Sequence, residues 1–179
     1  LAVNQVLDSP EVVTMFDHLE QLVARSETDH TQVFETYLNE YADLAGKVIN
    51  TFIPVGSHPD MGRYLYDPLT AYSENGGKRH RPLICVAAAH AVGGDHRRAF
   101  SSGAAIEHFH TAALIHDDIA DEAELRRGEP CLHLTEGMGL AINMGDLALS
   151  MVNGPVVNDP LLEDAVKVRV IKELIAMTC

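Results

Sequence analysis

The sequence predicts an all-α fold, in which helices pack antiparallel across short loops. Apolar residues recur three and four positions apart through most of the chain, as they do along one face of a helix. No convincing alternation of apolar and polar residues predicts a strand, and no repeat or low-complexity tract interrupts the pattern. All 179 residues are therefore expected to form one helical domain with its own core.

Two amphipathic helices are expected in the first third of the chain. Asp8-Ser-Pro-Glu11 has the pattern of a capping box with a proline in the first turn, and the helix behind it extends to about Arg25. After a polar break at 26–30, a second helical stripe extends from Phe34 to Phe52. Its aromatic side chains are expected in the core.

The remaining helices alternate with turn signals. Residues 54–62 predict a loop before a short helix through 65–72, and Asn75-Gly76-Gly77 predicts a turn before an Ala-rich helix that ends at Gly93-Gly94. A helix over 104–123 follows, and Gly128 and Pro130 interrupt the pattern after it. Two more helices are expected over 140–152 and, behind an Asn158-Asp159-Pro160 cap, over 161–175.

Composition excludes several classes of protein. The net charge of −13 lacks the basic footprint of a nucleic-acid-binding protein, so no nucleic acid is expected as a partner. Cys85, Cys131 and Cys179 are scattered, which disfavours a disulfide framework or a zinc knuckle and favours a reducing, cytoplasmic environment. No apolar run reaches the length of a membrane span and no secretory signal is visible, so no transmembrane segment is expected.

An aspartate cluster follows the apolar segment that begins at Ala104. If the helix continues through Ala123, Asp117 and Asp121 lie one turn apart on one face, where like charges repel. A counter-cation would relieve this repulsion, and two carboxylates with waters and a polyanionic ligand suit Mg²⁺. Taken alone, the cluster is more typical of a solvated acidic helix end.

Two basic groups could hold phosphate. Gly76 and Gly77 permit a sharp bend, after which Lys78 and Arg81 fall on the first turn of a helix beside free backbone N–H groups. Arg126-Arg127 repeats the theme. Taken alone, each group is more typical of solvated surface charge.

Three histidines lie near the aspartates. His108 and His110 fall on different helix faces and no HExxH motif is present, so zinc is not expected. His110 precedes Asp117 by seven residues, two turns along the same face, and could point into the same cavity. His116 is expected to pack or to support a metal ligand indirectly, and Asp146 to be structural.

Together these segments are far more specific than any one of them. GGKRHRP at 76–82, FHTAALIHDDIAD at 109–121, ELRRGEP at 124–130 and AINMGD at 141–146 occur in that order on a helical chain. They closely resemble the trans-isoprenyl diphosphate synthases, which make farnesyl, geranylgeranyl and longer polyprenyl diphosphates. The resemblance extends from about Tyr66 to the C-terminus, and DDIAD matches the family's first aspartate-rich motif without its insertion. It implies the isoprenoid synthase helical bundle, of which this chain supplies the N-terminal helices.

The resemblance implies a role for each matching residue. Asp117 and Asp121 would bind Mg²⁺ ions that bridge to an allylic diphosphate, with Asp118 assisting. Arg126 would contact the same diphosphate. The diphosphate of isopentenyl diphosphate would be held by Lys78, Arg81, His110 and Arg127. The implied reaction is ionisation of the allylic C–O bond, attack by the homoallylic alkene and loss of a proton, in an enzyme expected to be a homodimer.

Product length is a hypothesis from helical geometry. Ala113 and Phe109 precede Asp117 by four and eight residues, which places them below it on the same wall. Ala112 and Ala113 are small where short-chain members of the family often carry aromatics. A tunnel would then stay open past the farnesyl chain, with Phe109 as its floor, and a geranylgeranyl (C20) or somewhat longer product is expected.

One departure from the family is large. The family's second aspartate-rich motif, which lies on later helices, has no counterpart before Cys179. We therefore expect this chain to be part of a longer enzyme and to be inactive alone. Two alternatives stay open. A class I terpene cyclase shares the fold but has no isopentenyl diphosphate for Lys78, Arg81 and Arg127 to hold. A non-catalytic subunit of a heteromeric prenyl synthase would have no use for an intact DDIAD.

Overall fold

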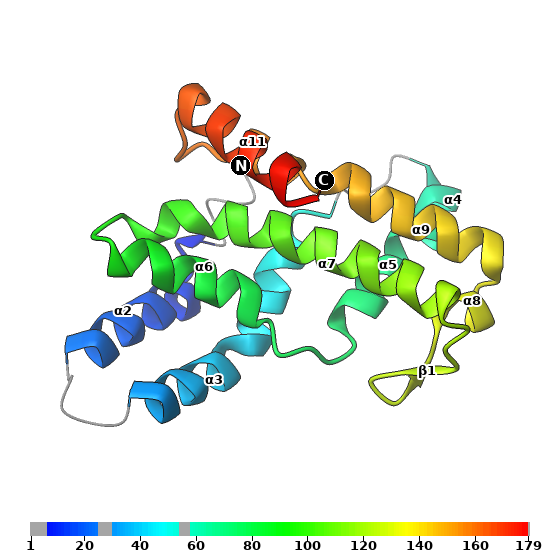
Figure 1. The fold of residues 1–179 in the computed structure, drawn as a ribbon, viewed down its shortest axis with the longest axis horizontal. Helices are drawn as coiled ribbons and strands as arrows, with labels where there is room; N and C mark the ends of the chain where they lie inside the picture. The colour runs from blue at the N-terminus through cyan, green and yellow to red at the C-terminus, as the bar shows by residue number, and fades with distance from the viewer. Residues whose placement is uncertain (1–6, 25–29, 54–57, 179) are drawn as a thin grey trace.

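Helices form nearly all of the computed structural model, which describes residues 7–24, 30–53 and 58–178 (Figure 1). The longer helices are α2 (Pro10–Ala24), α3 (His30–Asn50), α5 (Asp67–Glu74), α6 (His80–Ala91), α7 (Phe100–Ala120), α9 (Met138–Met151) and α11 (Asp164–Thr178). Short helical segments are α4 (Pro59–Met61), the π-helical η1 (Gly62–Tyr66), the 3₁₀-helical η2 (His96–Ala99), α8 (Leu132–Thr135) and α10 (Gly154–Val157). The all-α prediction is confirmed, apart from a small hairpin of β1 (Leu125–Arg126) and β2 (Glu129–Pro130).

The central helix is α7, which extends through the middle of the molecule with α6 and α9 beside it (Figure 1). Glycines allow both neighbours to approach closely. A Cβ on Gly103 of α7 would lie 2.7 Å from the Cα atom of Pro82 in α6, and a Cβ on Gly145 of α9 would clash with Nε2 of His116. These two contacts therefore fix how near α6 and α9 lie to the helix that carries the aspartates.

Buried apolar side chains form three clusters along α7. The first joins α2 and α3 to α6 and the start of α7, and contains Phe16 and Tyr37, so the aromatic residues of α3 do belong to the core. The second lies between α5, α7 and α9, around Leu69 and Met144. The third joins α7 to α10 and α11, where Leu174 is buried. Each neighbour of α7 thus has its own hydrophobic contact with it.

The N-terminal helices begin and end close to their predicted bounds. The cap of α2 is Ser9 rather than Asp8, because the Ser9 hydroxyl accepts a hydrogen bond from the Val12 backbone N–H at 3.4 Å, while Asp8 pairs with Arg97. The second helix ends at Asn50, two residues before its predicted end. The predicted break at 26–30 lies outside the described residues apart from His30, and Cys179 lies outside them too. Of the predicted loop at 54–62, residues 54–57 are not described, and 59–62 are helical rather than a loop.

Later helices differ more from their predicted bounds. Central helix α7 covers 100–120 rather than 104–123, and the last helix begins at Asp164 rather than near Leu161. Before α11, an Asp159 carboxylate oxygen accepts a hydrogen bond from the Leu161 N–H at 2.8 Å. This aspartate therefore caps a separate turn, not the last helix.

The expectation that no segment could span a membrane needs a correction. By length and composition alone, the 20 residues Met138–Val157, with a mean hydropathy of 1.2, would be long and apolar enough to do so. The core helix of a soluble protein passes the same test, and 44% of this window is buried inside the molecule. These residues make up α9 and α10, which pack on α7.

Candidate active site

Helix α7 ends in a way that keeps two carboxylates one turn apart. Asp121 follows the last helical residue, and its N–H donates to the Asp117 carbonyl oxygen at 2.8 Å. Glu122 then takes a left-handed conformation with φ of 52°, and its N–H donates to the Ile119 carbonyl oxygen at 3.2 Å. This is the arrangement of a Schellman cap, which more often uses glycine at this position. The helix is shorter than predicted, but the predicted relation of Asp117 to Asp121 holds.

Asp117 and Asp121 suit a hard divalent cation. Both are exposed, and in the described part of the chain neither carboxylate has a hydrogen-bond or ion-pair partner. They lie at the C-terminal end of α7, where the helix dipole adds negative potential. Solvent-accessible carboxylate oxygens in a negative potential are ligands that Mg²⁺ accepts while it keeps part of its water shell. The residues present therefore fit the predicted magnesium ion.

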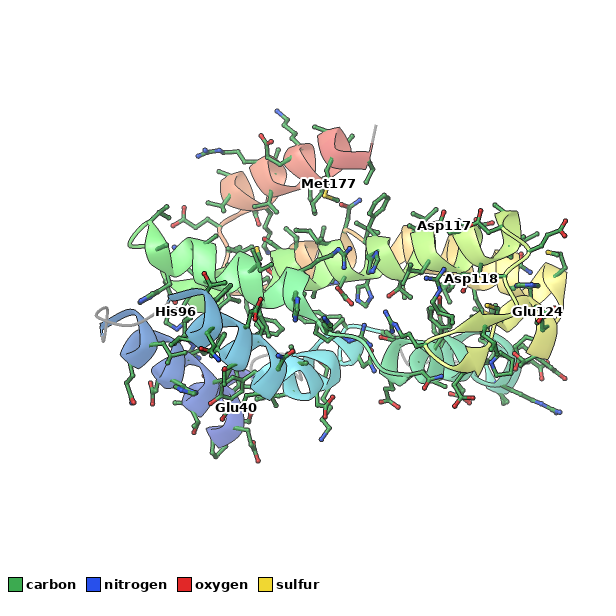
Figure 2. The ribbon with its side chains drawn as sticks, turned by 60° about the horizontal axis from the view of Figure 1, so that its bottom comes forward. Glu40, His96, Asp117, Asp118, Glu124 and Met177 are labelled. Atoms are coloured by element: carbon green, nitrogen blue, oxygen red, sulfur yellow. The ribbon has the colours of Figure 1, made fainter. Side chains whose placement is uncertain are left out.

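Asp118 differs from its neighbours because it is 1% exposed and fully bonded. Its Oδ1 accepts a hydrogen bond from Nε of Arg126 at 2.7 Å and another from the same guanidinium's Nη2, and its Oδ2 accepts one from the Tyr72 hydroxyl at 3.1 Å. Figure 2 shows Asp117 and Asp118 on opposite sides of α7. The predicted assistance of Asp118 in metal binding does not match this geometry, in which Asp118 holds Arg126.

Electrostatics keep the Asp118 network in one protonation state. Burial, followed by the charge of Asp118 and their hydrogen bond, raises the pKa of Tyr72, so its hydroxyl stays protonated and donates. The hydrogen bond to Asp118 is also the main cause that raises the pKa of Arg126. Arg126 is thus a permanently charged group, fixed through its Nε and Nη2 beside the end of α7.

The hairpin after α7 directs two adjacent arginines to different places. Arg126 pairs with Glu129 across the strands, and the two loop residues, Arg127 and Gly128, have φ of 55° and 88°. Positive φ at both positions is typical of the two-residue type I′ turn. From this tip, Nη1 of Arg127 donates to the Asn75 carbonyl oxygen at 3.2 Å. The hairpin therefore connects the end of α7 with the loop before α6, a link that the sequence did not predict.

The two predicted basic groups meet at this link. A Cβ on Gly77 would lie 3.0 Å from Nη1 of Arg127, so glycine leaves room for the guanidinium. Gly77, Lys78 and Arg127, with Gly76 and two residues of α3, line a pocket of about 490 Å³. Lys78 precedes α6 rather than lying in its first turn, since α6 begins at His80. The expectation that Lys78 and Arg81 share the first turn of a helix was therefore wrong, whereas Lys78 and Arg127 line the same pocket.

His110 lies in the field of the same basic group. Burial lowers the pKa of His110, and the charges of Arg81, Arg127 and Arg79 lower it further. A neutral imidazole among several cations can donate one hydrogen bond without adding to their repulsion. The four residues expected to hold one diphosphate thus share a neighbourhood.

A buried ion pair beside this group was missed from the sequence. Nη1 of Arg79 lies 2.7 Å from Oε1 of Glu107, and the two side chains are 4% and 3% exposed. Arg79 has φ of 46° just before α6, and a Cβ on Gly46 of α3 would lie 3.2 Å from its Nε. Arg79 belongs to the basic segment GGKRHRP at 76–82, whose charges taken alone were expected to be solvated, and it is buried instead. The available signal was Glu107, an acid within an otherwise apolar stretch of α7.

The three residues assigned to chain length do not share one environment. Ala112 is fully buried in the core cluster between α5 and α9, so packing accounts for its small size. Phe109 is half-buried against the cluster that joins α7 to α11, and Ala113 is half-buried. The assignment of Ala112 to a tunnel wall is therefore withdrawn, while Ala113 and Phe109 keep theirs as predictions.

The other two histidines near the aspartates make helix contacts. Nε2 of His116 lies 3.5 Å from an Asp146 carboxylate oxygen, and its ring packs on Gly145 of α9. His108 is buried, which lowers its pKa to about 4. Both are accounted for by packing.

Known proteins match most of this chain. The sequence matches the polyprenyl synthetase family over residues 62–177. A geranylgeranyl diphosphate synthase of Sulfolobus acidocaldarius is 41% identical over 114 residues, which make up 64% of this chain and 33% of that protein. The chain therefore spans about a third of that protein's length.

Solved structures show the same partial coverage. The geranylgeranyl pyrophosphate synthetase of Pyrococcus horikoshii Ot3 has 34% identity and a TM-score of 0.72, covering 83% of this chain and 44% of its own. The geranyltransferase of Helicobacter pylori, in complex with magnesium and isoprenyl diphosphate, has 27% identity and a TM-score of 0.54, with 75% and 48% coverage. The described fold corresponds to about half of each structure.

Proposed function

Because the chain belongs to the polyprenyl synthetase family, we propose that the protein containing it is a Mg²⁺-dependent prenyltransferase. It condenses isopentenyl diphosphate with an allylic diphosphate and releases pyrophosphate and a trans-polyprenyl diphosphate. One observation carries the proposal: the unpartnered Asp117 and Asp121 end the same helix that the Arg126-Arg127 hairpin ties to the Lys78 loop. A class I cyclase or a non-catalytic subunit would not require this second, basic group.

Residues at the end of α7 would receive the allylic diphosphate. Asp117 and Asp121 would hold Mg²⁺, which supplies the positive charge that stabilises a departing pyrophosphate. Arg126 adds a fixed cation, because two of its nitrogens are bonded to Asp118 and Nη1 remains to donate to a phosphate oxygen. Asp118 orients the guanidinium before substrate arrives, which is the usual basis of electrostatic preorganisation.

The pocket between the loop and the hairpin would receive isopentenyl diphosphate. Lys78 and Arg127 line it, and Arg81 and His110 lie in the same electrostatic neighbourhood. Burial, and then the charges of Arg79 and Arg126, lower the pKa of Arg127, and a bound diphosphate would offset part of this repulsion. The negatively charged substrate would thus stabilise basic side chains that repel one another when no anion is bound.

The apolar wall of α7 would protect the reacting carbons. Ala113 and Phe109 lie toward the N-terminal side of Asp117, and both are half-buried. Exclusion of water from this wall would let the alkene, rather than water, attack the allylic cation. We infer a geranylgeranyl-length product from the same residues, in a homodimeric protein of the cytoplasm.

The direct test is the double substitution Asp117→Ala with Asp121→Ala in the full-length protein. We expect Mg²⁺-dependent condensation to fall by about 100-fold or more, since metal-assisted charge stabilisation supplies several kcal/mol. Glu124→Ala is the matched control, because Glu124 is an exposed acid just beyond the same helix end. The proposal would be refuted if the doubly substituted protein condensed the two substrates as fast as the Glu124→Ala control.

A further inference from the structure

A second cluster of metal-ligating side chains lies away from the candidate active site. Glu20 belongs to α2, His90 to the last turn of α6, and His96 to η2, and one ligand atom from each lies within 4.8 Å of the other two. Figure 2 places His96 at the end of the molecule opposite Asp117 and Asp118. Three elements that are separate in the sequence thus bring one ligand each to the same point.

The imidazole of His96 is held in place by packing. It is 9% exposed, its ring centroid lies 4.6 Å from that of Phe16, and it meets the His90 ring nearly edge to face at 5.4 Å. The other nearby carboxylate, Asp95, is occupied by the Arg97 N–H at 3.0 Å, whereas Glu20 is exposed. Burial also lowers the pKa of His96, which keeps the ring in its neutral, ligating form.

We propose that Glu20, His90 and His96 bind a divalent transition-metal ion, Zn²⁺, with water completing its coordination. Two imidazoles and one carboxylate are donors that suit Zn²⁺, whereas Mg²⁺ prefers oxygen alone. Ligand atoms of a tetrahedral zinc site lie about 3.4 Å apart, so the three atoms must move together by roughly an ångström. The exposed Glu20 and the half-buried His90 at the end of α6 have the freedom to do so, while His96 stays fixed.

Such an ion would join the N-terminal helix to the body of the molecule. Phe16 of α2 and His96 of η2 are in ring contact, as described above. At the end of α6 away from His90, the helix begins just after the loop that carries Lys78. A shared metal would add a bond between all three elements. The ion is structural, and it is independent of prenyl transfer and of the Asp117 and Asp121 carboxylates.

The test is titration of Zn²⁺ alone into the chelator-treated full-length protein that carries Asp117→Ala with Asp121→Ala. This background removes the candidate metal site at the end of α7, so the result does not depend on the proposed activity. We expect one equivalent of Zn²⁺ to bind and to raise the melting temperature. Co²⁺ in its place should give the visible absorption of a four-coordinate site with nitrogen ligands.

Two variants spare the packed His96 ring. Glu20→Gln and His90→Ala should each weaken Zn²⁺ binding at least tenfold and reduce the thermal shift, since each removes one of three ligands. Asp17→Asn, an exposed acid on α2, and His58→Ala, an exposed histidine before α4, should leave both unchanged. The proposal is overturned if the parent takes up no zinc, or if both ligand variants bind it as tightly as the controls.

Discussion

Arg79 and Glu107 form an ion pair beside the basic group, and both charged side chains are shielded from water. Each side chain is under 5% exposed, so neither charge can be solvated if the other is lost. Removing one partner costs more stability than the intact pair contributes, because the other charge stays buried without compensation. Arg79 itself has a left-handed backbone conformation, with φ of 46°.

We therefore expect Glu107→Gln to lower the free energy of unfolding by about 3–5 kcal/mol. Chemical denaturation of the full-length protein measures this change. Replacing both partners, by Arg79→Met with Glu107→Leu, should restore part of the stability. Asp8→Asn, which breaks the exposed pair with Arg97, is the control and should cost under about 1 kcal/mol. Equal effects of Glu107→Gln and Asp8→Asn would show that the buried charge is solvated after all.

Ala113 carries the prediction on product length. Its replacement by Phe in the full-length protein should shorten the product distribution toward farnesyl diphosphate, because an aromatic ring would fill the space one turn below Asp117. Analysis of product lengths measures the effect. Ala176→Phe, at an exposed position of α11, is the control for added bulk. An unchanged distribution would rule out Ala113 as a limit on chain growth.

Single residues could be predicted where their role depends on local spacing. The helical repeat alone predicted that Asp117 and Asp121 lie one turn apart, whereas the glycines before Lys78 predicted a helix start two residues too early, since α6 begins at His80. The bond of Asp118 to Arg126 depends on a hairpin whose turn is set by backbone conformation. Arg79 and Glu107 are 28 residues apart in the chain, and a single sequence does not show that these two positions meet in the fold.

Among the elements, long amphipathic helices were predicted and short irregular ones were not. Helix α3 shows a continuous apolar stripe, and it begins four residues before its predicted start at Phe34 and ends two residues before its predicted end at Phe52. The hairpin has two residues in each strand, too few for an alternating pattern to show. The π-helical turn over 62–66 packs against α9, and neither its conformation nor this contact can be read from helix propensity.

The loop before α6 and the hairpin provide a test at this scale through Gly77→Ala. An added Cβ would displace the flexible guanidinium of Arg127, which lies 3.0 Å away, and cost it the bond to Asn75. We expect KM for isopentenyl diphosphate to rise about five- to tenfold, the equivalent of one hydrogen bond, with little change in stability.

Steady-state kinetics with each substrate varied in turn measures this effect. Gly139→Ala in α9 is the control, since a Cβ there would meet nothing within 4 Å. The link between loop and hairpin has no part in substrate binding if both variants keep the parent's KM for isopentenyl diphosphate.

For the whole molecule, α9 offers a surface for the proposed homodimer. It packs on α7 with one face, and the opposite face exposes three large apolar side chains, Met138, Ile142 and Leu149. Several large apolar side chains exposed on one helix face are a candidate protein interface. Pairing through α9 would bring two copies of the central helix close to one another.

The full-length protein should therefore sediment as a dimer, and Ile142→Asp with Leu149→Asp should make it a monomer. Burying two charges in an apolar interface would cost several kcal/mol, which is more association free energy than most dimers of moderate size can lose. Val168→Asp with Ile175→Asp is the matched control, because these two apolar residues are also exposed, on α11. A dimer that resists the α9 substitutions must associate through another surface.

The bond from Arg127 to the Asn75 carbonyl has one more consequence, for the entropy of binding. A free arginine on a hairpin tip samples many rotamers, and a ligand that captures it must offset that lost freedom, about 0.5–1.5 kcal/mol for such a side chain. Here the protein has restricted the side chain before any anion arrives. A diphosphate would only exchange the carbonyl acceptor for a charged one, so the arriving substrate meets an arginine that is already ordered.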